Sequence, residues 1–331
     1  MRQKNNILRI GIDLLGSDLP PAQLLGPLVA LHQELKEKVL FTFFIPPALA
    51  KEIPTEIRTV ICTEVITMED EPLSALRKKK HSSIIQGVTQ LQNHEIDAFI
   101  SAGNTGALFA SSQILIPLLP GIERSALLAL LPTKKKVVAV IDVGANLQCK
   151  SQHLIQFALM GIAYQKSRGV EKPVVGLLNI GTEPKKGTPE LQETYKHLHA
   201  LSEKGSFHFF GNIEGRDLFQ GDIDLLVTDG FSGNVLLKTA EGLAFSILEL
   251  LTENKAGLPP SHLQASLAAL RYRLHYEEHP GAILCGIDGI IIKCHGTGAA
   301  SSFVSSAKAA MHLIEHNFLG KIKQQLSHSV S

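Results

Sequence analysis

The chain has 331 residues, of which 44% are hydrophobic and 19% charged, and its formal net charge is +1. Such a chain can bury a substantial apolar core, which places it among soluble globular proteins that need no disulfide or metal staple. The balanced charge excludes an overall field that would draw the protein to nucleic acid, although local basic patches can still bind acidic partners. The four cysteines are scattered without a C-x-x-C pair, which indicates reduced thiols.

Short apolar runs rich in β-branched residues predict strands along the whole chain. In chain order they cover residues 7–13, 40–45, 59–66, 97–101, 137–142, 174–179, 207–210, 224–228 and 289–295. Helical periodicity predicts helices over residues 82–93 and 152–167, and a helical hairpin over about 236–276 that is broken at Pro259 and Pro260. Apolar strands that alternate with helices favour a mostly parallel sheet covered on both faces. We expect no signal peptide and no membrane span, because no apolar stretch approaches ~20 residues.

The ends of the predicted strands share one feature, a small polar residue or histidine beside a glycine. A single end of this kind is ordinary turn chemistry. Their repetition favours one shared site, because ligands of open α/β sheets bind outside the carboxyl ends of the strands. Glycine there lets the backbone approach a ligand and direct N–H groups at it. The polar residues concerned are Asp13, Ser101, Asp142, Asn179, Asp229 and His295.

Common motifs are absent from these ends. The stretch "GTEPKKGT" is not a P-loop, "GFSGN" lacks the order of a nucleophile elbow, and "HGTGAAS" lacks the third glycine of a dinucleotide fingerprint. No sequence motif suggests a metal. What remains suits an anion: glycine-rich turns, lysines and asparagines. The lysines are Lys185, Lys186 and Lys238, and the asparagines are Asn104, Asn146, Asn179, Asn212 and Asn234.

The stretch "TDGFSGNVLLKTAEG" illustrates the expected anion site. We expect a helix to open near Asn234, with unpaired N–H groups and a positive dipole end, and with Lys238 one turn further on. Lys238 as a solvated helix lysine explains the same spacing equally well. If the anion is phosphate, no catalytic triad is needed, because the dianion is already an oxygen nucleophile. Backbone N–H groups and asparagine amides would then form an oxyanion hole at the acyl carbon.

Several ordered blocks are similar to those of one known family. They are "IGIDLLGSDLPP", "EDEPLSALRKKKHSS", "SAGNTGAL", "IDVGAN", "LLNIGTEPKKGTPE", "FFGNIEGRDLFQGDIDLLVTDGFSGNVLLKTAEG" and "GIIIKCHGTG". In these blocks the chain resembles, nearly end to end, the bacterial phosphate acyltransferases of phospholipid synthesis, the PlsX family. It departs at Leu14, Leu15 and Ser17, where the family usually has Ala, Met and Gly, and at Pro280, where the family has an aromatic residue or asparagine.

The resemblance implies a three-layer α/β/α sandwich with a mostly parallel sheet, like isocitrate and isopropylmalate dehydrogenases and phosphotransacetylases. It implies a single domain over residues 1–331 with the hairpin projecting from it. It also implies transfer of a long-chain acyl group from acyl carrier protein to inorganic phosphate, by a cytoplasmic homodimer that uses no cofactor and no metal. Peripheral contact with the inner face of the membrane, where a glycerol-3-phosphate acyltransferase consumes the acyl phosphate, is implied as well.

Within this resemblance the strand-end residues receive roles. We expect Lys185 or Lys186 to meet phosphate or the developing oxyanion, on a loop stiffened by Pro184 and ended by a helix that Thr188 caps. His295 is expected either to protonate the leaving thiolate or only to hydrogen-bond substrate. The further catalytic candidates are Asn104 and Lys238. The substrate-binding candidates are Asp13, Gly103, Thr105, Gly106, Asp142, Asn146, Asn179, Gly181, Thr182, Asn212, Asp229, Gly230, Ser232, Gly233 and Asn234.

Two surface features have alternative interpretations. The basic run Arg77, Lys78, Lys79 and Lys80 is either a solvated loop before a helix capped by Ser82 or the docking site of an acidic carrier protein. The hairpin at 236–276 either lies on lipid or forms the dimer interface, and the apolar pattern slightly favours the interface.

Three other functions are alternatives for this sequence. A short-chain phosphotransacetylase would need a coenzyme A pocket. An NAD-dependent decarboxylating dehydrogenase would need an acidic metal cluster, which the sequence does not show. A non-catalytic regulator that binds carrier protein would not need all the polar strand ends. One assay separates them: formation of acyl phosphate from phosphate with long-chain acyl carrier protein or with acetyl-coenzyme A.

Overall fold

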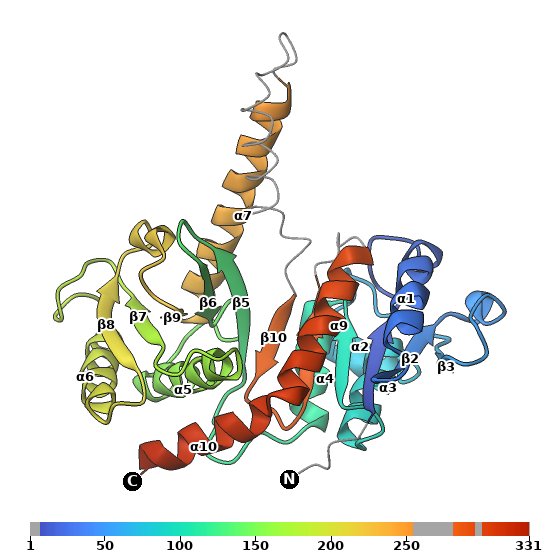
Figure 1. Ribbon diagram of the computed structural model, residues 1–331, viewed down its shortest axis with the longest axis horizontal. Helices are drawn as coiled ribbons and strands as arrows, with labels where there is room; N and C mark the ends of the chain where they lie inside the picture. The colour runs from blue at the N-terminus through green and yellow to red at the C-terminus, as the bar shows by residue number, and fades with distance from the viewer. Residues whose placement is uncertain (1–6, 254–280, 295–299, 331) are drawn as a thin grey trace. The chain divides into compact units, whose positions relative to one another are not determined.

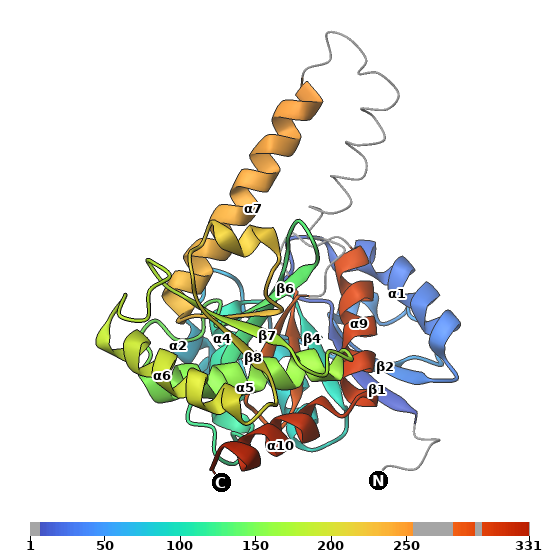
Figure 2. The same ribbon diagram turned by 60° about the vertical axis from the view of Figure 1, so that its left-hand side comes forward.

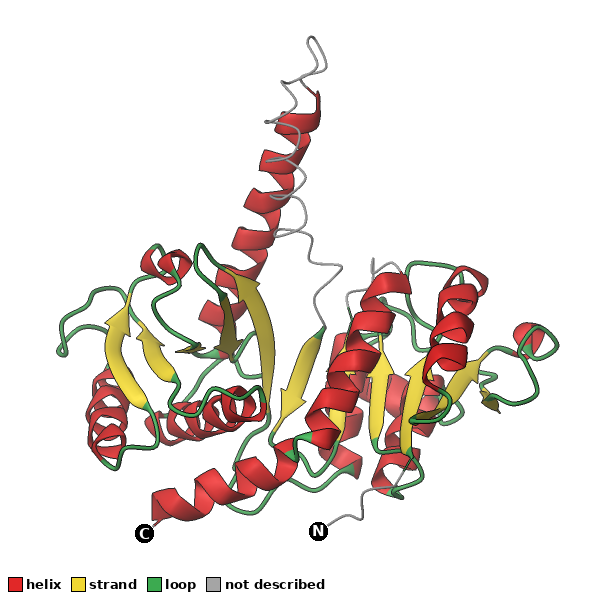
Figure 3. Ribbon diagram, viewed as in Figure 1, coloured by secondary structure: helices red, strands yellow, loops and turns green. Residues whose placement is uncertain are grey.

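Strands and helices alternate along the chain, as the apolar runs predict (Figure 3). The computed structural model describes residues 7–253, 281–294 and 300–330. The chain divides into two compact units, which we call the first unit (residues 1–125 and 280–331) and the second unit (residues 126–279). The single domain expected over residues 1–331 stays a prediction.

The first unit contains strands in the order β3-β2-β1-β4-β11-β10. All neighbouring strands in this order are parallel except the pair β10–β11. Its strands are β1 (Leu8–Asp13), β2 (Val39–Ile45), β3 (Arg58–Ile61), β4 (Ala98–Ser101), β10 (Ala282–Cys285) and β11 (Ile290–Lys293). Its helices are α1 (Pro21–Leu35), α2 (Pro72–Lys78), α3 (Ser83–Gln92), α4 (Thr105–Leu115), α9 (Ala300–Glu315) and α10 (Phe318–Val330).

Helices cover the strands of the first unit on both faces. α1 and α9 pack together on one face, and α3 and α4 pack together on the other, with α2 against α4 (Figures 1 and 2). Four phenylalanines, Phe41, Phe43, Phe44 and Phe99, are fully buried among these strands. α3 approaches β4 so closely that a Cβ on Gly87 would lie 2.0 Å from the Phe99 ring, so this contact requires glycine. Burial of this apolar surface drives the packing.

The second unit contains strands in the order β5-β6-β9-β7-β8. β5 and β6 are antiparallel, and the remaining neighbours are parallel. Its strands are β5 (Ala126–Pro132), β6 (Val137–Ile141), β7 (Val174–Leu178), β8 (His208–Ile213) and β9 (Leu225–Val227), and its helices are α5 (Ser151–Ser167), α6 (Pro189–Glu203) and α7 (Gly230–Glu253). α5 packs on β6 and β9, α6 on α5 and β8, and α7 on β5 and β6. α7 extends well beyond the strands of its own unit (Figures 1 and 2).

The sequence predictions hold for most strands and differ from the structure at four elements. β5 and β10 were not predicted, because neither apolar run ends in the polar–glycine pattern that marks the parallel strands. β3 ends at Ile61, several residues before the predicted end of its run. α7 begins at Gly230 and not near Asn234. The second half of the predicted hairpin, after Glu253, lies outside the described residues.

Candidate active site

In the second unit, the carboxyl ends of β6, β9, β7 and β8 lie side by side, because these strands are parallel neighbours. Three loops leave from this edge. They are the loop after β6 (residues 142–146), the loop after β9 that leads into α7, and the loop after β7 (residues 179–188). The candidates of the second unit are therefore brought to one edge of its strands, as the strand-end pattern predicts.

The loop after β6 wraps around the carboxylate of Asp142, which is completely buried. This carboxylate accepts hydrogen bonds from the backbone N atoms of Gly144 (3.1 Å), Ala145 (3.0 Å) and Asn146 (2.8 Å). It also accepts from Asn146 Nδ2 (2.9 Å) and from the backbone N of Leu127 in β5 (2.9 Å). Burial raises the pKa of Asp142, and these bonds oppose the rise. The loop thus binds an anion that belongs to the protein itself.

The start of α7 likewise has a carboxylate of the protein itself as hydrogen-bond acceptor, that of Asp229. Asp229 accepts hydrogen bonds from the backbone N (2.7 Å) and the Oγ (3.0 Å) of Ser232, and its carbonyl accepts from the N of Gly233. The N of Gly230 donates to the carbonyl of Asn146 at 2.7 Å. The expectation of unpaired N–H groups at this helix start is therefore wrong for Gly230, Ser232 and Gly233, because nearby acceptors satisfy them first.

Two further candidates lie on α7. Asn234 Nδ2 donates to the carbonyl of Val143 (3.1 Å), which ties the helix to the loop after β6. Gly233 packs so tightly that a Cβ would lie 1.9 Å from the Asp142 carbonyl oxygen. Lys238 is exposed, and its ammonium pairs with Glu241 at 2.7 Å. The pair shows that Lys238 already has an anionic partner, and its catalytic role stays a prediction.

Loop 179–188 has the opposite hydrogen-bond pattern, because side-chain amides occupy its carbonyl oxygens. Asn212 Nδ2 donates to the carbonyl of Glu183 (2.8 Å), and Asn179 Nδ2 to that of Lys186 (3.1 Å). Gln192 Nε2 donates to the carbonyls of Lys185 (2.9 Å) and Gly187 (3.2 Å). The amides therefore come from the end of β7, from β8 and from the first turn of α6.

Most N–H groups of the same loop have no acceptor among the residues that the structure describes. They are those of Gly181, Thr182, Glu183, Lys185, Gly187 and Thr188. The side chains of Lys185 and Lys186 are exposed, and neither ammonium pairs with a described residue. Thr188 caps α6 through Leu191 N, with Pro189 in the first turn, as predicted. Free N–H groups beside two ammonium groups form a surface suited to an oxyanion.

In the first unit, Asp13 ends β1 and is completely buried. It accepts hydrogen bonds from Ser101 Oγ at the end of β4 (2.7 Å) and from Leu15 N (2.9 Å). Burial raises the pKa of Asp13 to about 6, against the lowering effect of the serine hydroxyls and of the nearby Lys293. Ser101 Oγ in turn accepts from the N of Gly103 (3.0 Å). Asp13 therefore orients the β4 end.

Asn104 has a structural task in the first unit. Its Oδ1 caps α4 by accepting from Ala107 N (3.0 Å), and its Nδ2 donates to the carbonyl of Thr67 (2.9 Å). It thereby ties α4 to the segment before α2. Thr105 and Gly106 form the exposed first turn of α4, where their N–H groups have no acceptor among the described residues. A catalytic role for Asn104 stays a prediction.

Sequence reasoning missed Lys293, the last residue of β11. Its Nζ donates to the carbonyl of Ala102, just after β4, at 3.1 Å and to that of the adjacent Cys294, and it lies close to Asp13. The signal was available, because Lys293 ends an apolar strand as the other candidates do. His295, the predicted candidate at this strand end, lies outside the described residues.

The basic run splits into two environments. Arg77 and Lys78 are exposed at the end of α2. Lys79 instead pairs with Asp70 at 2.5 Å and donates to the carbonyl of Val65. This pairing lowers the pKa of Asp70. Ser82 occupies the cap position of α3 as predicted, but its hydroxyl makes no capping bond.

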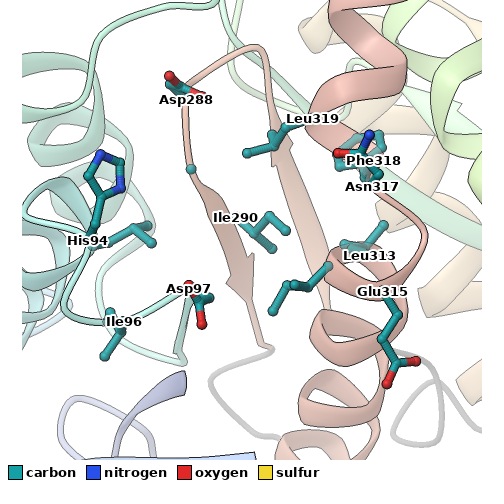
Figure 4. Close-up of a pocket in the computed structure, with 13 residues that line it drawn as sticks. His94, Ile96, Asp97, Asp288, Ile290, Leu313, Glu315, Asn317, Phe318 and Leu319 are labelled. Carbon is teal, nitrogen blue, oxygen red and sulfur yellow. The ribbon is translucent and has the colours of Figure 1, made fainter. Parts of the chain in front are cut away.

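A cavity of about 570 Å³ opens in the first unit, away from all of these residues (Figure 4). It lies at the amino ends of β4 and β11, between the residues around His94 and Asp97, the turn at Asp288, and the α9–α10 junction at Phe318. The candidates of this unit lie at the carboxyl ends of the same strands, so the cavity is separate from the predicted site.

Comparisons with known proteins identify relatives along the whole chain. The model of a family described as "Fatty acid synthesis protein" matches residues 8–321. A phosphate acyltransferase of Desulforamulus reducens is 37% identical over 97% of this chain and 98% of its own length. A phosphate acyltransferase of Geobacillus thermodenitrificans is 38% identical over 96% and 99%.

Solved structures with low sequence identity share the fold. A branched-chain phosphotransacylase from Enterococcus faecalis has a TM-score of 0.61 at 15% identity, covering 94% of this chain and all of its own. A putative 4-hydroxythreonine-4-phosphate dehydrogenase from Salmonella typhimurium has a TM-score of 0.52 at 14% identity. The match covers 93% of this chain and all of the dehydrogenase chain. The mostly parallel α/β fold with flanking helices is therefore that of the phosphotransacetylases and of dehydrogenase-like proteins, as expected.

Proposed function

Because this chain belongs to the phosphate acyltransferase family and is an acyltransferase of fatty acid and phospholipid synthesis, we propose that its acyl donor is a long-chain acyl-acyl carrier protein. Phosphate oxygen attacks the thioester carbonyl, the C–S bond breaks, and acyl phosphate and the carrier-protein thiol leave. The thiolate takes up one proton. No cofactor enters this balance.

The observation that carries the proposal is the hydrogen-bond pattern of loop 179–188. Four of its carbonyl oxygens accept from side-chain amides, whereas most of its N–H groups and the ammonium groups of Lys185 and Lys186 are available to an oxyanion. Phosphate held there needs no general base, because the dianion is itself nucleophilic near neutral pH. Positioning and charge control then supply the rate enhancement. Asn104 and His295 are the further predicted participants, whereas the ion pair with Glu241 leaves Lys238 a smaller part in this proposal.

Carrier protein docks, in this proposal, on the exposed part of the basic run. Arg77 and Lys78 are accessible at the end of α2. Lys79 contributes less, since its ammonium is already held by Asp70. Charge reversal at Arg77 and Lys78 should raise the KM for carrier protein and leave the KM for phosphate unchanged, because surface charges act mainly on encounter.

The same proposal includes a cytoplasmic homodimer with peripheral membrane contact, next to a glycerol-3-phosphate acyltransferase that takes the acyl phosphate. α7 supports it with large apolar side chains that are exposed in this chain, Leu243, Phe245, Ile247 and Leu250. The spacing of Leu243, Ile247 and Leu250 puts them on one face of the helix, and contiguous exposed apolar side chains mark interaction surfaces. No helix within the described ranges is long and apolar enough to cross a bilayer.

Acyl phosphate formation tests the proposed function directly. Purified protein is incubated with labelled phosphate and either palmitoyl-acyl carrier protein or acetyl-coenzyme A, and labelled acyl phosphate is separated from phosphate. We expect product with the carrier-protein substrate. Product with acetyl-coenzyme A alone would identify a short-chain phosphotransacetylase, and carrier-protein binding without product would identify a regulator.

A further inference from the structure

We propose that Gln192 is a positioning residue for phosphate, which acts by holding the backbone of loop 179–188 in its anion-binding conformation. The inference rests on the proposed function of this loop and adds a residue that the strand-end pattern did not indicate. Gln192 lies in the first turn of α6, and its side chain is half-buried.

The geometry of Gln192 is that of a two-pronged clamp. Its own backbone N donates to the carbonyl of Thr188 within the helix (3.0 Å), which fixes the start of the side chain. Its Nε2 donates to the carbonyls of Lys185 (2.9 Å) and Gly187 (3.2 Å). One amide group therefore holds the carbonyl of the residue before Lys186 and that of the residue after it. A side-chain amide has two N–H donors, which is enough for one on each carbonyl.

Asn179 and Asn212 complete the clamp from the strand side. Asn179 Nδ2 holds the carbonyl of Lys186, and Asn212 Nδ2 holds that of Glu183. Both residues are buried, and in this arrangement they act on the loop backbone. The sequence pattern had suggested that they bind substrate directly.

The clamp matters for anion binding because of the charges on a peptide group. A carbonyl oxygen carries partial negative charge and repels phosphate, whereas an N–H group attracts it. Amide donors that fix the carbonyls on the protein side leave the N–H groups and the lysine side chains for the ligand. Without Gln192, the carbonyls of Lys185 and Gly187 are free to rotate towards solvent and to compete with the N–H groups.

Steady-state kinetics of Gln192→Met test the inference, because methionine keeps the length of the side chain and removes both donors. We expect the KM for phosphate to rise about tenfold, while the KM for the acyl donor and the Tm stay near wild type. Gln192→Glu should raise it further, because a carboxylate faces two carbonyls and the bound anion. Lys196→Met, at an exposed position one turn further along α6, is the matched control and should behave as wild type.

Each other result overturns the inference. A phosphate KM that is unchanged in both Gln192 variants means that the clamp does not position phosphate. A parallel rise for both substrates, or a lower Tm with an unchanged phosphate KM, means that Gln192 is only structural. The double variant Lys185→Ala/Lys186→Ala, measured alongside, separates the two levels. If the double variant keeps the wild-type phosphate KM, the proposed phosphate site on loop 179–188 is wrong. If its phosphate KM rises and that of Gln192→Met does not, only the proposed role of Gln192 is wrong.

Discussion

The loops after β6 and β7 have similar sequences at their starts, an acidic or amide residue followed closely by glycine, but opposite hydrogen-bond patterns. In the loop after β6, the N–H groups of Gly144, Ala145 and Asn146 converge on the carboxylate of Asp142. In loop 179–188, amide side chains take up the carbonyls, and most N–H groups have no acceptor among the described residues. A polar residue and a glycine at a strand end are therefore compatible with two different tasks.

The difference follows from the charge of the residue that ends the strand. A buried aspartate is an anion, and the nearest N–H groups satisfy it because an unpaired buried charge is very costly. Asn179 is neutral, so it can donate to a carbonyl and leave N–H groups for another anion. We infer that the loops that begin at Asp142 and Asp229 form the rigid frame of the site and that loop 179–188 meets the substrate.

The lysines of loop 179–188 should have the largest effect if this division is right. We expect Lys185→Ala/Lys186→Ala to lower kcat/KM for phosphate about 10²- to 10³-fold, equivalent to about 2.7–4 kcal/mol of transition-state stabilisation. The Tm should not change, because both side chains are exposed and unpaired within the described structure. Initial rates over a range of phosphate concentrations measure this, and near-wild-type activity would contradict the assignment.

Asp142→Asn should have its effect on stability and not specifically on phosphate. The amide replaces one acceptor oxygen by a donor that faces N–H groups of its own loop. Lost charge-assisted bonds and unsatisfied donors should cost about 2–3 kcal/mol in the free energy of unfolding. Urea denaturation measures the loss. A variant with wild-type stability and a raised phosphate KM would reverse the roles of the two loops.

The sequence predicted most of the parallel strands and the edge that holds the candidates, because both follow from local patterns. Apolar runs marked the parallel strands, and Thr188 with Pro189 marked the start of α6. The hydrogen-bond partners of the polar side chains could not be predicted from the sequence. Whether Asn212 faces a substrate or the carbonyl of Glu183 depends on the separation of β8 from a loop 29 residues away in sequence. Gln192 was missed for the same reason, since a glutamine on a helix has no signature as a clamp.

Asp13 makes the stability of the protein depend on pH. Its pKa in the folded state is about 6, above the ordinary aspartate pKa of 3.8, because it is buried. The folded state thus binds the proton more tightly, and stability that is fully present below pH 3.8 is lost as the pH rises through about 6. We expect the full loss to be about 3 kcal/mol. Urea titrations at pH 4 and pH 7 should show a smaller difference for Asp13→Asn than for wild type; an equal difference would contradict it.

Two glycines that flank α6 allow a matched test of the clamp geometry. Gly187 and Gly205 have nearly equal left-handed φ values, 83° and 84°. A Cβ on Gly187 would lie 2.5 Å from Asn179 Oδ1, whereas one on Gly205 would meet nothing within 4 Å. Both alanine variants should lose roughly 1–2 kcal/mol of stability from backbone strain. Only Gly187→Ala should also lower kcat/KM for phosphate, by about tenfold; equal kinetics in the two variants would show that the clamp tolerates displacement.

Substitution of Lys238 should have the smallest effect on activity. It tests whether a lysine on α7, next to the loops that hold the carboxylates of Asp142 and Asp229, contributes to catalysis as the lysines of loop 179–188 are expected to do. Its ammonium pairs with Glu241, one turn along α7, and its side chain is 52% exposed. Such surface pairs contribute about 0.2–1 kcal/mol, so Lys238→Met should leave kcat/KM for phosphate within about threefold of wild type and stability within 1 kcal/mol. A loss of a hundredfold or more would mean that Lys238 leaves Glu241 to act on the reacting groups. The start of α7 would then contact the substrate, as loop 179–188 is proposed to do, because the ammonium of Lys238 would act on the reacting groups.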